Sequence, residues 1–156
     1  MKTIYLIRHA ESGWDNTTTD FERVLTEKGI EDATSVSNNM TCNPDIIIAS
    51  PAVRTTETAT IFANALNYNI AEIDYEISIY EAPLQNLINK VNQIDTKHQT
   101  AVLVGHNPGI TQLANYLADD NLSPVQPCTV MKIELEVDNW NEVIKGIGSI
   151  LSINQP

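Results

Sequence analysis

The sequence predicts an α/β protein in which a mostly parallel, twisted sheet lies between two layers of helices. Short apolar runs alternate with amphipathic stretches along the 156 residues, which is the order of strand–helix–strand units. The early apolar runs are continuous, as in strands buried on both faces, whereas the last ones alternate with charged residues. We therefore expect a three-layer α/β/α fold whose C-terminal edge is antiparallel.

The first part of the chain predicts two strands and two helices. Thr3 to Ile7 is a short apolar run that fits a buried strand. Thr26 can cap a helix running to about Met40, because a threonine oxygen accepts hydrogen bonds from the first free amides of a helix. Ile46 to Ala49 predicts a second buried strand, and Val53 to about Leu66 a second helix. The apolar face of the first helix is predicted to comprise Ile30, Ala33, Val36 and Met40.

The middle of the chain continues the alternation. Ile70 to Ile79 contains a weaker third strand. Apolar residues between Leu84 and Ile94 recur at helical spacing. Ala101 to Val104 predicts a fourth strand, and Ile110 to Leu117 the next helix.

The C-terminal part predicts two antiparallel strands near an edge of the sheet. From Met131 to Val137, apolar residues alternate with lysine and glutamate, as in a strand with one solvated face. Asp138-Asn139 then turns the chain into a last strand that starts around Val143 or Ile147 and ends near Ile153. No linker or repeat divides the sequence, so we expect a single domain over residues 1–156.

Composition limits the classes of partner. Acidic residues outnumber basic ones 20 to 9, and the formal net charge is −11. This charge argues against nucleic acid and anionic membrane surfaces as partners, since clustered Lys and Arg bind both. No apolar run approaches a membrane span or a signal-peptide core, so a cytoplasmic location is expected. Cys42 and Cys128 form no paired motif and are expected to be reduced thiols.

Arginine and histidine side chains concentrate after the predicted strands. Of three arginines and three histidines, two of each follow a strand end: Arg8-His9 follows the first, Arg54 the second and His106 the fourth. Glu81 follows the weak third strand. Ligands of open α/β sheets bind outside the carboxyl ends of the strands, so these residues mark the expected site.

Anion handling is the chemistry that these side chains could share. Arginine presents a planar fork that matches phosphate oxygens, and a neutral histidine is a good nucleophile near pH 7. Nearby arginines lower the pKa of a histidine and keep it neutral. The sequence has no phosphate-binding G-x-x-x-x-G-K-[ST] loop, no Cys-x₅-Arg motif, no G-x-G-x-x-G fingerprint and no metal-ligand spacing. We therefore expect phosphoryl transfer through a phosphohistidine, with no metal and no cofactor.

Four ordered motifs strengthen this hypothesis, and they lie between residue 2 and about residue 135. They are L-I-R-H-A-E-S at residues 6–12 with Asp20-x-x-Arg23-x-Leu25-Thr26-x-x-Gly29, Ser50-Pro51-x-x-Arg54-x-x-x-Thr58-Ala59, Tyr80-Glu81-Ala82, and V-G-H-N-P-G at residues 104–109. Together they resemble the histidine phosphatase superfamily, which has the phosphoglycerate mutase-like fold. Within it, the chain is most similar to the small SixA-type phosphohistidine phosphatases.

The resemblance implies a role for each matching residue. His9 would be the nucleophile, with Arg8, Arg54 and His106 completing the phosphate pocket. Glu81 stands where larger relatives carry a general acid, although the small group varies there.

Other positions near the motifs carry expectations of their own. Ser12 could donate a hydrogen bond to phosphate. Asp15 stands where mutases often place an asparagine, so its carboxylate is expected to point away or to meet a cationic part of the substrate. Arg23 is expected to pin its loop, and Trp14 to pack that loop.

Each residue also has a simpler interpretation: Arg54 could pair with Glu57 along its helix, and His106 could be an ordinary loop residue. The main hypothesis is a metal-independent phosphatase that removes phosphate from phosphohistidine on a protein. The alternative is a small-molecule phosphomonoester phosphatase or mutase with the same machinery. A catalytically silent phosphate-binding module is a third hypothesis, because a fold does not guarantee an activity.

Overall fold

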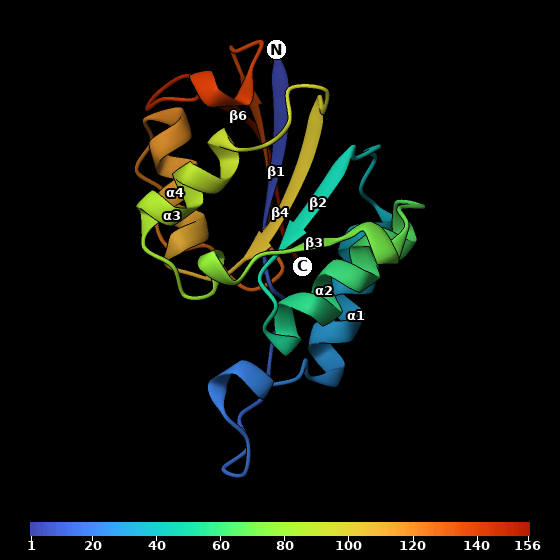
Figure 1. Cartoon of the computed structure of the whole chain (residues 1–156). Coiled ribbons are helices and arrows are strands. Elements are labelled where there is room, and N and C mark those ends of the chain that lie inside the picture. The colour runs from blue at the N-terminus through green and yellow to red at the C-terminus, as the bar shows by residue number, and fades with distance from the viewer.

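A computed structural model describes all residues from 1 to 156, and its centre is one six-stranded sheet (Figure 1). The strand order is β3-β2-β4-β1-β5-β6. The first four strands of this order run parallel, and β5 and β6 are antiparallel to their neighbours. The predicted mostly parallel sheet with an antiparallel edge is therefore confirmed. The bounds are β1 Lys2–Arg8, β2 Ile46–Ala49, β3 Asp74–Tyr75, β4 Thr100–Gly105, β5 Val130–Leu135 and β6 Gly148–Asn154.

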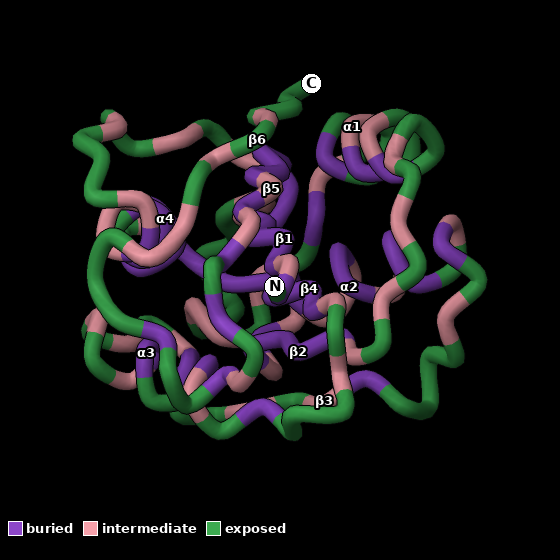
Figure 2. Tube along the Cα trace, turned by 90° about the horizontal axis from the view of Figure 1, so that it is seen from above, coloured by how far each residue is buried: buried purple, intermediate pink, exposed green.

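Four α-helices cover the two faces of the sheet. Seen from above, α1 and α2 lie on one side of the strands, and α3 and α4 on the other (Figure 2). None of the helices combines the length and apolar character needed to cross a membrane. The helices span Glu27–Asn38 (α1), Val53–Ala65 (α2), Leu84–Asn92 (α3) and Gly109–Ala118 (α4).

The core is divided by the sheet, because side chains alternate between the faces of a strand. In β1, Ile4 and Leu6 belong to the apolar cluster on the α3–α4 side, and Tyr5 and Ile7 to the cluster on the α1–α2 side. Both clusters contain buried residues from β4 as well, which accounts for the continuous apolar runs in the sequence.

The carboxyl ends of the parallel strands meet at one end of the sheet, the lower end in Figure 1. After β1, a long excursion extends beyond this end before the chain returns to α1 (Figure 1). A bridge between Ser12 and Leu25 closes its base. The N-cap Thr26 accepts a hydrogen bond from Gly29, whose backbone lies so close to the Glu11 carbonyl that a Cβ there would collide with it.

The weaker third strand was predicted too long. Only Asp74–Tyr75 pairs with β2, between 3₁₀ turns at residues 70–72 and 77–79. Side chains favour these turns: the Asn69 side chain accepts from the Ala71 amide, and the Glu76 carboxylate from the Ser78 amide. Such bonds between side chain and backbone compete with a sheet ladder.

Two further predictions about elements were wrong in part. Ile30 is exposed, because α1 buries its small residues Gly29, Ala33 and Ser37 instead. Met40 lies beyond the end of α1. The last strand begins at Gly148, next to the expected start at Ile147. The alternative start at Val143 was wrong, because Val143 is buried beside a 3₁₀ turn at residues 140–142.

Candidate active site

The predicted site residues line one open cavity of about 390 Å³ at the carboxyl ends of the strands. Arg8 is the last residue of β1, Arg54 lies in the first turn of α2, and His106 follows β4. His9 is 7% exposed and Arg54 only 3%, so the imidazole and the guanidinium both lie below the surface. The lining residues are Arg8, His9, Glu11, Ser12, Trp14, Asp20, Arg23, Arg54, Glu81, His106, Asn107 and Pro127.

The His9 ring is fixed by its own neighbour. Its Nδ1 lies 2.7 Å from the Ala10 carbonyl oxygen. A carbonyl oxygen can only accept, so Nδ1 carries the proton and Nε2 keeps its lone pair. Burial lowers the pKa of His9 to about 4, and the charges of Arg54 and Arg8 add to this. At neutral pH the ring is therefore uncharged, with a lone pair on Nε2.

His106 faces His9, with ring centroids 5.4 Å apart. Its Nε2 lies 2.7 Å from the Ser50 hydroxyl, and its Nδ1 is buried with no hydrogen-bond partner. Burial lowers the pKa of His106 to about 3, with a smaller contribution from His9. The ring is therefore neutral, and the Ser50 hydroxyl can donate to Nε2 and leave the proton on Nδ1.

Arg54 pairs with Asp20, not with Glu57. Its Nη1 donates to the Asp20 carbonyl at 2.6 Å and its Nη2 to the Asp20 carboxylate at 3.0 Å. Glu57 instead accepts from the Leu25 amide at 2.8 Å. The Asp20 contacts tie the excursion to α2 and hold the guanidinium over the cavity.

The Asp20 carboxylate has three donors around it. Tyr80 donates its hydroxyl at 2.6 Å and Arg23 donates at 3.1 Å, in addition to Arg54. Burial raises the pKa of Asp20, but the hydrogen bonds from Tyr80, Arg23 and Arg54 outweigh it and hold that pKa well below its usual range. Burial and this carboxylate together raise the pKa of Tyr80 to about 12.

Unsatisfied donors gather in the cavity walls. Four buried side-chain nitrogen or oxygen atoms in the whole chain lack a partner, and three of them are Arg8 Nε, Arg54 Nε and His106 Nδ1. Buried polar groups are nearly always paired, and the three residues that carry these unpaired atoms all line one cavity, which favours a ligand there that can accept hydrogen bonds. All three can donate, and two belong to cations. The complementary group is an anion with several oxygens, such as phosphate.

Ser12 and Arg23 shape the wall formed by the excursion. Arg23 donates to the Ser12 hydroxyl at 2.8 Å and to the Gly13 carbonyl at 3.0 Å, so it pins this loop. The Ser12 oxygen accepts, which leaves its own proton free to donate. The Asp15 carboxylate accepts hydrogen bonds from the Thr17 amide at 2.8 Å and from the Thr17 hydroxyl at 2.7 Å. Asp15 does not line the cavity.

Glu81 lies at the mouth of the cavity. Its side chain is 58% exposed, with Oε1 3.8 Å from Arg54 Nη2. Its φ of 46° is in the left-handed region, which costs energy for a residue other than glycine. Beside it, a groove of about 610 Å³ runs between the first turns of α3 and α4, and it shares Glu81, His106 and Asn107 with the cavity.

Sequence reasoning did not assign roles to Asp20, Tyr80 or Ser50. All three stand in the quoted motifs, so the signal was present. Asp20 and Tyr80 are 60 residues apart, however, and their contact depends on how two loops fold. The Ser50 contact with His106 joins the ends of β2 and β4 in the same way.

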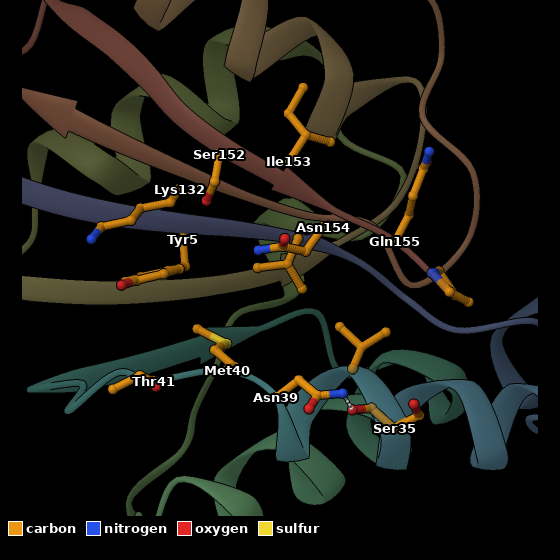
Figure 3. Close-up of a pocket in the computed structure, with 13 residues that line it drawn as sticks. Tyr5, Ser35, Asn39, Met40, Thr41, Lys132, Ser152, Ile153, Asn154 and Gln155 are labelled. Atoms are coloured by element: carbon orange, nitrogen blue, oxygen red, sulfur yellow. Dashed lines mark hydrogen bonds between the residues drawn. The ribbon is translucent and has the colours of Figure 1, made fainter.

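A larger cavity, of about 680 Å³, lies on another part of the molecule (Figure 3). It runs between α1 with its C-cap, which supply Ser35 and Asn39, and the β5–β6 end of the sheet. Lys132 is the one charged side chain in its lining, and the lining contains no histidine. It lacks the clustered arginines and histidines of the smaller cavity. Nowhere do three or more His, Cys, Asp or Glu side chains come together to hold a metal ion.

Comparison with known families decides the class of protein. The model of the histidine phosphatase superfamily (branch 1) matches residues 4–82, a stretch that includes Arg8, His9, Arg54 and Glu81. The chain belongs to the histidine phosphatase superfamily. An uncharacterised protein of Mycobacterium tuberculosis is 24% identical over 162 residues, which cover 96% of this chain and 99% of that protein.

Solved structures of this superfamily share the fold. The SixA protein of Agrobacterium tumefaciens superposes with a TM-score of 0.83 at 23% identity, over 99% of this chain and 98% of that one. The protein histidine phosphatase SixA in complex with tungstate gives a TM-score of 0.83 at 14% identity, over 98% and 96%. A mycobacterial glucosyl-3-phosphoglycerate phosphatase gives 0.74 at 12% identity, over 96% and 97%. The family and the fold support phosphatase activity.

Proposed function

We propose that this histidine phosphatase removes phosphate from phosphohistidine on a protein, through a covalent phosphohistidine at its own His9. One observation carries the proposal: His9 presents an Nε2 lone pair inside a cavity that two arginines and His106 surround. The catalytic roles of the site residues are part of this proposal.

In the first step, His9 Nε2 attacks phosphorus in line with the bond to the leaving imidazole. A P–N bond forms at His9 while the P–N bond of the substrate breaks. Arg8, Arg54 and His106 Nδ1 donate to the equatorial oxygens, where preorganised donors contribute most. Glu81, at the cavity mouth, supplies a proton to the departing imidazole nitrogen.

In the second step, a water molecule attacks the phosphorus on His9. The new P–O bond forms as the P–N bond to Nε2 breaks, and inorganic phosphate leaves. Glu81, now ionised, accepts the proton that the water loses. The Ala10 carbonyl holds the proton on Nδ1 throughout, so that Nε2 regains its lone pair.

The open mouth of the cavity supports a protein substrate. Only 51 residues separate Arg54 from His106, and α2, β3, α3 and β4 with two 3₁₀ turns occupy most of them. Little chain remains for a lid, so a small ester gains few contacts beyond its phosphate. A protein can bind the surface around the mouth and use that binding energy at the transition state.

The alternative is a small-molecule phosphomonoester phosphatase or mutase. The fold shared with a glucosyl-3-phosphoglycerate phosphatase supports this alternative. Measuring kcat/KM for a panel of substrates distinguishes the two proposals. The panel comprises a protein phosphorylated on histidine, a short phosphohistidine peptide, sugar phosphates, phosphoglycerates and nucleotides.

We expect the phosphoprotein to exceed every free metabolite by at least about tenfold, which corresponds to roughly 1.4 kcal/mol of transition-state binding. The advantage should shrink for the peptide. A metabolite turned over as efficiently as the phosphoprotein would support the small-molecule alternative instead. Tungstate should compete with every substrate, and EDTA should leave the rate intact because arginines meet the phosphoryl charge.

A further inference from the structure

Trp14 stands out among the residues around the cavity, because its side chain is exposed to solvent and yet one face of its ring is in contact with another residue. It is 75% exposed, the highest value among the large apolar residues of the chain. Large aromatic side chains are costly to leave in water and are enriched at the centres of protein interfaces. The sequence predicted that it packs its loop, and the structure shows that it does so on one face only.

The covered face of Trp14 rests on Arg23. The guanidinium carbon lies 3.8 Å from the ring centroid, which is a close cation–π contact. Arg23 is itself held by Ser12, Gly13 and Asp20. The indole is therefore held from below while its other face stays open, and a preorganised side chain loses little entropy when it binds a partner.

Trp14 lies on a different part of the rim from the α3–α4 groove. It lines the phosphate cavity but not the groove, which shares Glu81, His106 and Asn107 with that cavity. A ligand that contacts phosphate, indole and groove together must extend to both sides of the phosphate. A folded protein surface can do this, whereas a compact metabolite engages the cavity alone.

We infer that Trp14 is the docking contact for the protein that carries the phosphohistidine. This inference rests on the proposed phosphatase function and names the surface that selects the substrate. The excursion around Trp14 carries Glu11, Asp15 and Glu22. Each of these carboxylates accepts hydrogen bonds from a threonine, and none forms a salt bridge that would neutralise its charge. The matching surface of the partner is apolar where it meets the indole and neutral or basic around it.

The test compares two substrates on the same enzyme variants. One is a small folded protein phosphorylated on a surface histidine with phosphoramidate, and the other is p-nitrophenyl phosphate. The measured quantity is the ratio of the two kcat/KM values, so that a general effect on catalysis through Arg23 cancels. Trp14→Ala should lower this ratio at least about fivefold, as for truncation of an interface hot spot, and Trp14→Phe should restore part of it.

Ile144→Ala is the matched control. Ile144 is also strongly exposed, at 59%, but it precedes β6 at the opposite end of the sheet, and the ratio should not change. An unchanged ratio in Trp14→Ala would overturn the inference, whether kcat/KM stays the same or falls equally for both substrates. If adenosine monophosphate were preferred to the phosphoprotein and Trp14→Ala removed that preference, the indole would stack on a base instead. Wild-type enzyme inactive on both substrates would contradict the phosphatase proposal itself.

Discussion

Removing the Ser50 hydroxyl tests how His106 is prepared to meet the phosphoryl group. Ser50 is fully buried, and its hydroxyl lies 2.7 Å from His106 Nε2. The Ala52 amide donates to the same oxygen, so the single hydroxyl proton is free to go to Nε2. The neutral His106 then carries its proton on Nδ1, where a phosphoryl oxygen can accept it.

The magnitude follows from the contact that is lost. In Ser50→Ala, the Nδ1–H form leaves Nε2 buried without a donor, which costs about 1–3 kcal/mol. The Nδ1–H form therefore loses its advantage over the Nε2–H form, and using the productive form at the transition state should cost about 5- to 150-fold in kcat/KM. Imidazole ¹⁵N chemical shifts report which ring nitrogen carries the proton, and aryl phosphate hydrolysis reports the rate.

Thr55→Val is the matched control for loss of a buried hydroxyl in the same segment. Thr55 donates to the Ser50 and Ala52 carbonyls and makes no hydrogen bond to His106. It should lower stability without moving the proton on His106. A Ser50→Ala enzyme with the wild-type ¹⁵N pattern and the wild-type rate would refute the reasoning.

Three further predictions concern other groups of the site. Arg54→Lys should lose about 10²–10³-fold in kcat, because an ammonium lacks the planar fork with which Arg54 holds Asp20 through Nη1 and Nη2 and still presents Nε; near wild-type kcat would contradict this. The His9 ring should titrate in NMR spectra with a midpoint near 4, not near 6.5. Since the unfolded chain takes up that proton first, His9 should reduce the free energy of unfolding by roughly 3 kcal/mol between pH 6.5 and 4 in urea titrations. Glu81→Gln should slow phosphoramidates and alkyl esters far more than aryl esters, whose leaving groups need little protonation; a uniform loss would assign Glu81 to positioning.

The sequence was most informative where one physical cause dominates. Continuous apolar runs predicted β1, β2 and β4, because burial on both faces leaves no room for polar residues. Once those strands are parallel, whatever follows them must gather at one end of the sheet. Arg8, Arg54 and His106 could therefore be placed near one another before their distances were known.

The remainder depends on contacts that no local pattern encodes. The Asp20 carboxylate reaches Arg54 only because the excursion after β1 folds back over α2, and its base needs Gly29 against the Glu11 carbonyl. The third strand was predicted too long because capping by Asn69 and Glu76 outweighs β propensity over a short segment.

The most direct test of the central claim is to trap the phosphoenzyme. The enzyme is mixed with ³²P-labelled phosphohistidine protein, quenched in alkali within the first turnover, and digested for mass spectrometry. We expect one labelled residue in the enzyme, with phosphate on His9 Nε2, stable in base and lost in acid. We expect no label in His9→Ala enzyme, whose turnover should also disappear. Label on another residue, or wild-type turnover by His9→Ala, would contradict it.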